Sequence, residues 1–256
     1  MNGGLMSLMR RIWVDCEIEL LEPLRVGAGR DPFSSIDLPV LKDFRGVPII
    51  PGSTLKGFFR SYLSGLLLAY KLAGGKELEL EGINLKLEPC VDSISENKID
   101  LKELDELCVL DRLFGYSGRA FSLASLVRLT DAEPLDSSLG TLRRTHVSID
   151  SGRDAARSRM LGDVEASKER DGDLRNPTRY KFTMVFDELS DPRFSCANDT
   201  FKLLLKLLSR GIEGFIGGWK SRGYGRVIVR ISGIRVAKIG DLIQGDVREA
   251  TLNDVM

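Results

Sequence analysis

A turn followed by a long amphipathic helix, in residues 49–70, constrains this chain more than any other stretch. Two isoleucines end at Pro51-Gly52, a dipeptide typical of turns. Ser53 or Thr54 is expected to cap the helix that follows. Apolar residues then recur at intervals of three and four, which is the pattern of a helix that buries one face. They are Leu55, Phe58, Phe59, Tyr62, Leu63, Leu66, Leu67 and Tyr70.

The first turns of this helix gather positive charge. Lys56 and Arg60 lie off the apolar stripe and follow closely after Ser53. Unpaired backbone N–H groups and the positive end of the helix dipole add to these cations, so the helix start is a physical site for a phosphate. An ordinary capped helix with solvated cations explains the same residues, and geometry alone favours that explanation.

Clear alternation of apolar and polar residues predicts two half-buried strands, at residues 12–20 and 180–186. Further strands are expected at residues 119–131 and 226–235. A second amphipathic helix is expected after the strand at residues 180–186, with Asn198 or Asp199 as its cap. Because strand and helix recur in both halves, we predict an α+β fold. Its core would be ferredoxin-like (RNA-recognition-motif-like), an antiparallel sheet packed by two helices.

The charge balance excludes a uniformly basic nucleic-acid binder but not a basic face. Lys plus Arg and Asp plus Glu each number 37, so the net charge is zero. Residues 92–111 are rich in acids, whereas five arginines lie in residues 143–159. There is no apolar run of membrane-spanning length, no signal-peptide core and no cysteine pattern of a disulfide framework. A soluble, cytoplasmic protein without a membrane partner is expected.

Asp37 lies in a loop between Ile36 and Leu38. Forming or capping a turn is the commonest use of a loop aspartate. The alternative is a carboxylate that holds a metal ion or positions a scissile phosphate. Chemistry alone favours the turn.

A glycine-dense loop lies at residues 217–225, with the sequence GGWKSRGYG. Gly217 and Gly218 allow backbone N–H groups to come close to phosphates. The loop also carries cations and aromatic residues, which can bind phosphates and stack on bases. These are Lys220, Arg222, Trp219 and Tyr224. We favour this interpretation, in which the loop contacts phosphates and bases, over a tight turn with ordinary surface residues.

Three of these stretches together resemble the signatures of the RAMP superfamily of CRISPR-associated proteins. The closest resemblance is to the backbone subunits of type III effector complexes. The signatures are IDLPV with PIIPGSTLKGFFR, then RTHVSID, then the glycine loop, in the family's order. Apolar spacing in residues 101–114 predicts a helix. The resemblance implies one RAMP domain over residues 1–256, with a lid-like insertion at 74–115 that contains this helix. It also implies a thumb-like extension at 143–178, built as an extended hairpin.

The resemblance also implies roles for particular residues. Guide CRISPR RNA would be bound along its sugar–phosphate backbone, and Asp37 matches the aspartate that backbone subunits need to cut single-stranded target RNA with a divalent cation, Mg²⁺. Further partners would be other CRISPR effector subunits and copies of the chain itself along the RNA. The implied guide-binding residues are Ser53, Lys56, Arg60, Arg143, Arg144, His146, Gly217, Gly218, Lys220 and Arg222.

Zinc is not expected, although relatives often carry a zinc-binding cysteine cluster before a Leu-Phe-Gly. Here only Cys90 and Cys108 precede that tripeptide. Two thiols do not complete a tetrahedral site, so both cysteines are interpreted as small buried apolar groups.

Two other functions stay open at this point. One is a non-catalytic, architectural RNA-binding subunit, in which Asp37 serves the turn. The other is a metal-independent endonuclease that processes guide RNA by general acid–base chemistry, for which such enzymes often use histidine. His146 is the only histidine, and it is expected in a sheet or on the surface rather than as a general base.

Overall fold

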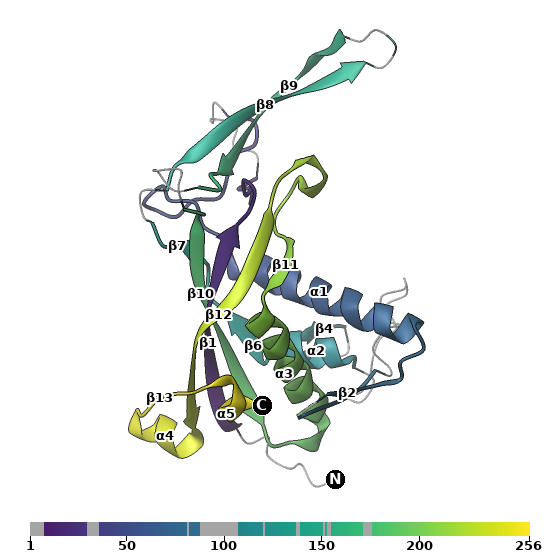
Figure 1. Cartoon of the computed structure of the whole chain (residues 1–256), viewed down its shortest axis with the longest axis vertical. Coiled ribbons are helices and arrows are strands. Elements are labelled where there is room, and N and C mark those ends of the chain that lie inside the picture. The colour runs from purple at the N-terminus through teal and green to yellow at the C-terminus, as the bar shows by residue number, and fades with distance from the viewer. Residues whose placement is uncertain are drawn as a thin grey trace.

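The computed structural model describes residues 8–29, 36–80, 82–87, 107–119, 121–136, 139–150, 152, 155–170 and 176–256. Its centre is an antiparallel sheet in the order β11-β12-β1-β10-β6, with β13 beside β12 and β7 beside β10 (Figure 1). The strands are β1 (Leu8–Leu20), β6 (Val127–Leu129), β7 (Glu133–Pro134), β10 (Arg179–Leu189), β11 (Ile212–Phe215), β12 (Arg226–Lys238) and β13 (Arg248–Glu249). The prediction of a mixed fold with an antiparallel sheet is confirmed.

The strand β1 lies in the middle of the sheet because it pairs with β10 on one side and β12 on the other. Its even-numbered residues from Ile12 to Leu20 are buried, as the alternation predicts. In β12 the buried positions change from odd to even numbers between Val229 and Ile234. A β-bulge causes this change, since Asp15 faces Gly233 while the next residue of β1 faces Ile231.

Three helices lie on one side of the sheet: α1 (Gly52–Leu72), α2 (Val109–Phe114) and α3 (Ser195–Arg210) (Figure 1). Aromatic contacts fix two of them to β10. Phe59 of α1 lies 6.0 Å from Phe182, and Phe201 of α3 stacks on Phe186 at 4.0 Å. Two short helices, α4 (Ile239–Gln244) and α5 (Leu252–Val255), follow β12. No described helix is long and apolar enough to cross a membrane.

Three two-stranded hairpins lie outside the main sheet. They are β2 (Glu77–Leu80) with β3 (Ile83–Lys86), β4 (Tyr116–Ser117) with β5 (Ser122–Leu123), and β8 (Thr141–Asp150) with β9 (Ala155–Ser167). The β8–β9 hairpin projects beyond one end of the sheet, and α4 lies at the opposite end (Figure 1). Short 3₁₀ turns, η3 (Pro192–Phe194) and η4 (Lys220–Arg222), precede α3 and follow β11.

Several element boundaries differ from the predictions. The helix α3 begins at Ser195, before the expected cap, because η3 leads into it and the Asp191 side chain accepts a hydrogen bond from Arg193 N. On α1, Leu66 and Tyr70 are each 39% exposed, so the buried stripe is narrower than expected. The helix predicted at residues 101–114 begins only at Val109, and residues 101–106 lie outside the described part of the chain.

Cys108 is buried, as predicted, but it is not a free thiol. Its side chain is disulfide-bonded, which a composition without a disulfide pattern did not suggest. Cys90, the other cysteine of this stretch, lies outside the described residues.

Candidate nucleic-acid interface

The start of α1 is held by another part of the chain rather than by its own serine or threonine. Ile50 exchanges two backbone hydrogen bonds with Ala132, which places Pro51 at the N-cap. Asp131 then accepts a hydrogen bond from Gly52 N at 2.8 Å. The predicted cap at Ser53 or Thr54 is therefore wrong, because a carboxylate distant in sequence occupies the capping position. Ser53 is left exposed at the helix start.

The two cations of α1 have different surroundings. Lys56 is half-buried, and its pKa is lowered first by burial and then by the charge of Arg60. Arg60 forms an ion pair with the buried carboxylate of Asp111 and also donates to Gly115 O at 3.3 Å. Its guanidinium thus ties α1 to α2, whereas Lys56 has no such carboxylate among the described residues.

An open hollow of about 530 Å³ lies between the start of α1 and the chain that runs from β11 into the glycine loop. The helix contributes Thr54, Gly57 and Phe58, and the other wall contributes Phe215, Gly217 and Lys220. Two stretches predicted to bind RNA, far apart in sequence, therefore share one hollow. Its lining combines a hydroxyl, an ammonium group, aromatic rings and glycine backbone.

The glycine loop packs closely on residues 23–25. Gly218 N donates to Arg25 O at 2.9 Å, and Gly225 N donates to Pro23 O at 2.8 Å. At Gly217, where φ is +81°, a Cβ atom would lie 2.2 Å from Arg25 O, so only glycine fits. These contacts fix the loop's shape before any ligand binds.

Trp219 and Tyr224, both predicted to stack on bases, differ in access. Tyr224 is 0% exposed, so its predicted stacking is excluded. Trp219 has a left-handed backbone (φ 62°) and is half-buried, with the Arg222 guanidinium 4.4 Å and the Arg25 guanidinium 5.7 Å from its ring centre. Arg25, whose pKa is lowered by burial, adds a cation that sequence reasoning missed.

The β8–β9 hairpin separates two neighbouring arginines onto opposite faces. Arg144 lies 5.7 Å from the Tyr224 ring, and His146 Nε2 is 2.8 Å from the Tyr224 hydroxyl, so this face meets the glycine loop. Arg143 instead forms an ion pair with Asp163 of β9, whose other oxygen accepts from the Thr145 hydroxyl at 2.6 Å. The alternation of a strand therefore divides the residues that were predicted as one contact.

The loop that carries Asp37 pairs with β9. Leu38 N donates to Asp163 O at 3.2 Å, and Glu165 N donates to Leu38 O at 3.1 Å. The Asp37 side chain is exposed, and its Oδ2 accepts a hydrogen bond from Asp163 N at 2.9 Å. Leu38 also joins Trp219 and Tyr224 in a small apolar cluster with the hairpin, so the Asp37 loop, the hairpin and the glycine loop converge.

The RAMP superfamily model matches residues 17–228 of this chain, a range that contains all three converging segments. The chain belongs to the RAMP superfamily. A similar protein is the CRISPR system Cms endoribonuclease Csm3 of Streptococcus thermophilus. It is 29% identical over 229 residues, which cover 85% of this chain and 86% of that protein. The resemblance to CRISPR-associated RAMP proteins is therefore confirmed.

This RAMP chain offers an incomplete setting for a divalent cation at Asp37. Mg²⁺ needs about six oxygen ligands in octahedral geometry. In the described part of the chain, no three His, Cys, Asp or Glu side chains form a metal-binding group. Asp163 contacts Asp37 through its backbone N–H, but its carboxylate is already bound to Arg143 and Thr145, which hold its pKa below the usual range. The described residues therefore do not build a metal site by themselves.

Glu165 is a second carboxylate that the RAMP signatures do not reveal. It accepts hydrogen bonds from Lys42, Thr141 and Val40 N, and so joins the Asp37 loop to both hairpin strands. Burial acts to raise its pKa, but these bonds outweigh burial and lower it. Asp163 and Glu165 escaped prediction because their partners depend on the hairpin register, which no sequence motif encodes.

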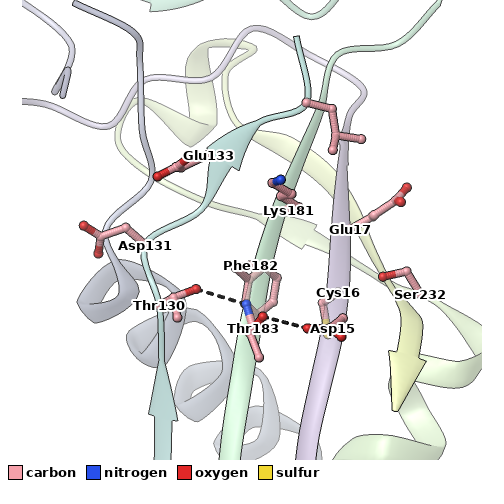
Figure 2. Close-up of a pocket in the computed structure, with 11 residues that line it drawn as sticks. Asp15, Cys16, Glu17, Thr130, Asp131, Glu133, Lys181, Phe182, Thr183 and Ser232 are labelled. Atoms are coloured by element: carbon pink, nitrogen blue, oxygen red, sulfur yellow. Dashed lines mark hydrogen bonds between the residues drawn. The ribbon is translucent and has the colours of Figure 1, made fainter. Parts of the chain in front are cut away.

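Figure 2 shows a different hollow, of about 510 Å³, on the face of the sheet away from α1 and α3. Asp15 accepts from the Thr183 hydroxyl at 2.7 Å and is paired with Arg235. Other carboxylates here surround Lys181, and none of the residues predicted to bind RNA lines the hollow. Paired charges of both signs make this a solvated surface, and it is not part of the candidate interface.

Proposed function

We propose that this chain is a backbone subunit of a CRISPR type III effector complex. It would bind guide RNA along the sugar–phosphate backbone and cleave complementary target RNA. The observation that carries the proposal is the convergence of the Asp37 loop, the β8–β9 hairpin and the glycine loop. The name of the similar protein, an endoribonuclease of a CRISPR system, supports the same function.

Guide binding is assigned to the surface that joins the start of α1 to the glycine loop. Guides differ in sequence, so a protein that serves all of them contacts phosphates and sugars rather than base edges. Ser53, Lys56 and Lys220 are accessible there, and Gly217 and Gly218 hold the loop in place. Arg222, Arg144 and His146 extend this surface along the hairpin. Arg60 is left out of it because Gly115 O and Asp111 together engage both of its terminal nitrogens.

The core is proposed to be ferredoxin-like. Such a core orders its four strands 4-1-3-2 and places two helices on one face. Here β12, β1, β10 and β6 have that order, and α1 and α3 follow the first and third of these strands in the chain. This arrangement places the α1 start and the glycine loop near one end of the sheet, where the hairpin projects (Figure 1).

Target cleavage is assigned to Asp37. The target's own 2′-hydroxyl oxygen would attack the adjacent phosphorus, forming a 2′-O–P bond as the P–O5′ bond breaks. The proton leaves the 2′-oxygen, and the departing 5′-oxygen gains one. Mg²⁺ is the proposed cofactor, and the described residues alone do not complete a site for it. Asp37 would orient the reacting groups.

A non-catalytic, architectural subunit is the second candidate, and one observation favours it. Asp37 Oδ2 accepts a hydrogen bond from Asp163 N, so the side chain also fastens its own loop to β9. Processing of guide RNA by His146 is disfavoured, since this ring is held between Tyr224 and Trp219.

The test uses the complex that the full chain forms when it is co-expressed with a guide RNA and its partner subunits. Lys56→Ala, Lys220→Ala and Arg222→Ala should weaken guide binding equally for all sequences and reduce its salt slope by about one per phosphate contact. Asp37→Ala and Asp37→Asn should abolish cleavage of a complementary RNA with guide binding unchanged. Asp31→Ala is the loop control, and EDTA tests the metal requirement.

Each outcome decides between the candidates. A loss of binding confined to one RNA sequence would contradict backbone recognition. Normal cleavage by Asp37→Ala would overturn the catalytic assignment. If no assembly cuts target RNA but guide binding follows the predicted pattern, the architectural function stands instead.

A further inference from the structure

Asp163 contacts both Asp37 and Arg143, the first through its backbone and the second through its side chain. Its backbone N–H donates to Asp37 Oδ2 at 2.9 Å. Its carboxylate forms an ion pair with Arg143, and the Thr145 hydroxyl holds the remaining oxygen at 2.6 Å. One residue of β9 therefore sets the positions of an acidic and a basic side chain together.

We propose that Asp163 is a positioning residue for target cleavage, which holds Arg143 beside Asp37 so that both act on one target phosphate. The inference rests on the proposed function and refines it. Arg143, expected on guide RNA from the resemblance, is thereby assigned to the target instead.

Arg143 has the donors that this role requires. Its side chain is 52% exposed, and one terminal nitrogen is bound to Asp163. A guanidinium carries five N–H donors, so the others remain for the oxygens of a phosphate. Asp37 alone would repel a phosphate, and a neighbouring cation offsets that repulsion. The pKa of Arg143 is raised first by its hydrogen bond to Asp163, and the charge of Asp37 contributes as well.

The two aspartates are not interchangeable. Both oxygens of Asp163 are engaged, and its pKa is lowered by the hydrogen bonds from Arg143 and Thr145, so it stays ionised and cannot carry a proton near neutral pH. Asp37 keeps one oxygen without a hydrogen bond from the described residues. Gly162 leaves space beside it, because a Cβ there would still be 3.9 Å from Asp37 Oδ2. The catalytic role is therefore assigned to Asp37, and Asp163 acts by positioning Arg143.

The neighbouring face of the hairpin supports this division of labour. Arg144 and His146 point to the glycine loop, which is assigned to the guide. Arg143 lies on the other face of β8, where it is paired with Asp163, and it shares no contact with the glycine loop among the described residues. Adjacent residues of β8 thus serve two different RNA strands.

The test is single-turnover cleavage of labelled complementary RNA by the assembled complex. Asp163→Asn keeps the backbone N–H and the side-chain shape but removes the charge that holds Arg143. We expect its rate, and that of Arg143→Ala, to fall about 10- to 100-fold, the range for one lost charged hydrogen bond. Arg143→Lys should retain part of the rate, because the charge remains without the fork. Guide affinity and the melting temperature should match the wild type.

Non-additivity is the decisive measurement. If Asp163 acts only through Arg143, the double variant Asp163→Asn/Arg143→Ala should be no slower than Arg143→Ala alone. The pH profile of Asp163→Asn should keep the shape of the wild-type profile. Multiplied losses in the double variant, or a missing limb of the pH profile, would overturn the proposal by giving Asp163 a role of its own. Arg179→Ala, which breaks an exposed pair with Glu17, controls for loss of a surface ion pair.

Failure of this inference can be told apart from failure of the proposed function. If Asp37→Ala abolishes cleavage while Asp163→Asn and Arg143→Ala cut at the wild-type rate, only the positioning role is wrong. If Asp37→Ala cuts normally, the catalytic function itself is wrong. Arg144→Ala should lower guide affinity, and a loss of guide affinity in Arg143→Ala instead would return Arg143 to the guide.

Discussion

Gly57 lies in the second turn of α1, and its backbone conformation does not require glycine. Its φ is not positive, and a Cβ atom there would meet nothing within 4 Å. In a helix interior, alanine is more stable than glycine by about 0.5–1 kcal/mol. The missing side chain nevertheless has an effect, since it keeps open the hollow that α1 shares with the glycine loop.

Filling this space should separate binding from stability. Gly57→Leu should weaken guide-RNA binding by about tenfold or more, because a side chain in the hollow excludes the RNA backbone, while stability should rise by a few tenths of a kcal/mol to about 1 kcal/mol. Fluorescence anisotropy and chemical denaturation measure the two effects. Gly65→Leu is the matched control, since Gly65 has the same open geometry on α1 but does not line the hollow. Equal binding losses in both variants would refute the assignment.

Other residues show which properties of a single side chain can be predicted from the sequence and which cannot. Residue type predicts that Arg60 and Tyr224 suit RNA, but their availability depends on neighbours distant in sequence. Asp111 forms an ion pair with Arg60, and residues of the hairpin pack against Tyr224 and help to bury it. Lys220 and Arg222 are exposed in η4, which belongs to a loop whose glycines are recognisable in the sequence. The sequence therefore identifies side chains whose chemistry suits RNA, whereas their exposure to solvent can be established only from the fold.

At the scale of elements, alternation predicted β1 and β10 well because a half-buried strand repeats every two residues. Boundaries were less accessible. The start of α1 depends on Asp131, which is 79 residues away in sequence, and α3 begins early because η3 precedes it. The bulge in β12 is an exception among these features. The buried positions change from odd to even numbers there, so a search for a break in the alternation of apolar residues would detect it.

The distant cap of α1 leads to a prediction about stability. Asp131→Ala should lower the free energy of unfolding by about 1 kcal/mol, the usual cost of losing an N-cap side chain. Ser53→Ala, the local residue expected to cap, should change it by less than about 0.5 kcal/mol. Urea denaturation of both variants gives the comparison. A larger cost for Ser53→Ala would mean that the helix is capped locally after all.

At the scale of the whole molecule, the β8–β9 hairpin extends beyond one end of the sheet (Figure 1). If copies line up along RNA, this hairpin is the element that can reach a neighbour. On RNAs of increasing length, the wild-type mass should rise in steps of one chain. Analytical ultracentrifugation checks this, and a strict monomer at saturating RNA would contradict the backbone role.

A variant with a shortened β8–β9 hairpin tests what the hairpin contributes to assembly along RNA. Val147 pairs with Leu161, so residues 148–160 can be replaced by an Asn-Gly turn that suits a two-residue hairpin connection. This variant keeps the contacts with the glycine loop and should bind a short RNA normally, but it should lose stepwise loading on long RNA. Unchanged loading would exclude the hairpin from assembly.

The central place of β1 has a consequence for how the protein is made. This strand is synthesised well before its two partners, β10 and β12. At roughly 5–20 residues per second, a ribosome would take on the order of 10–30 s to deliver β10 after β1. During that interval β1, one face of which is apolar, lacks both of its partner strands. Nascent chains released before residue 179 should therefore be protease-sensitive and depend on chaperones.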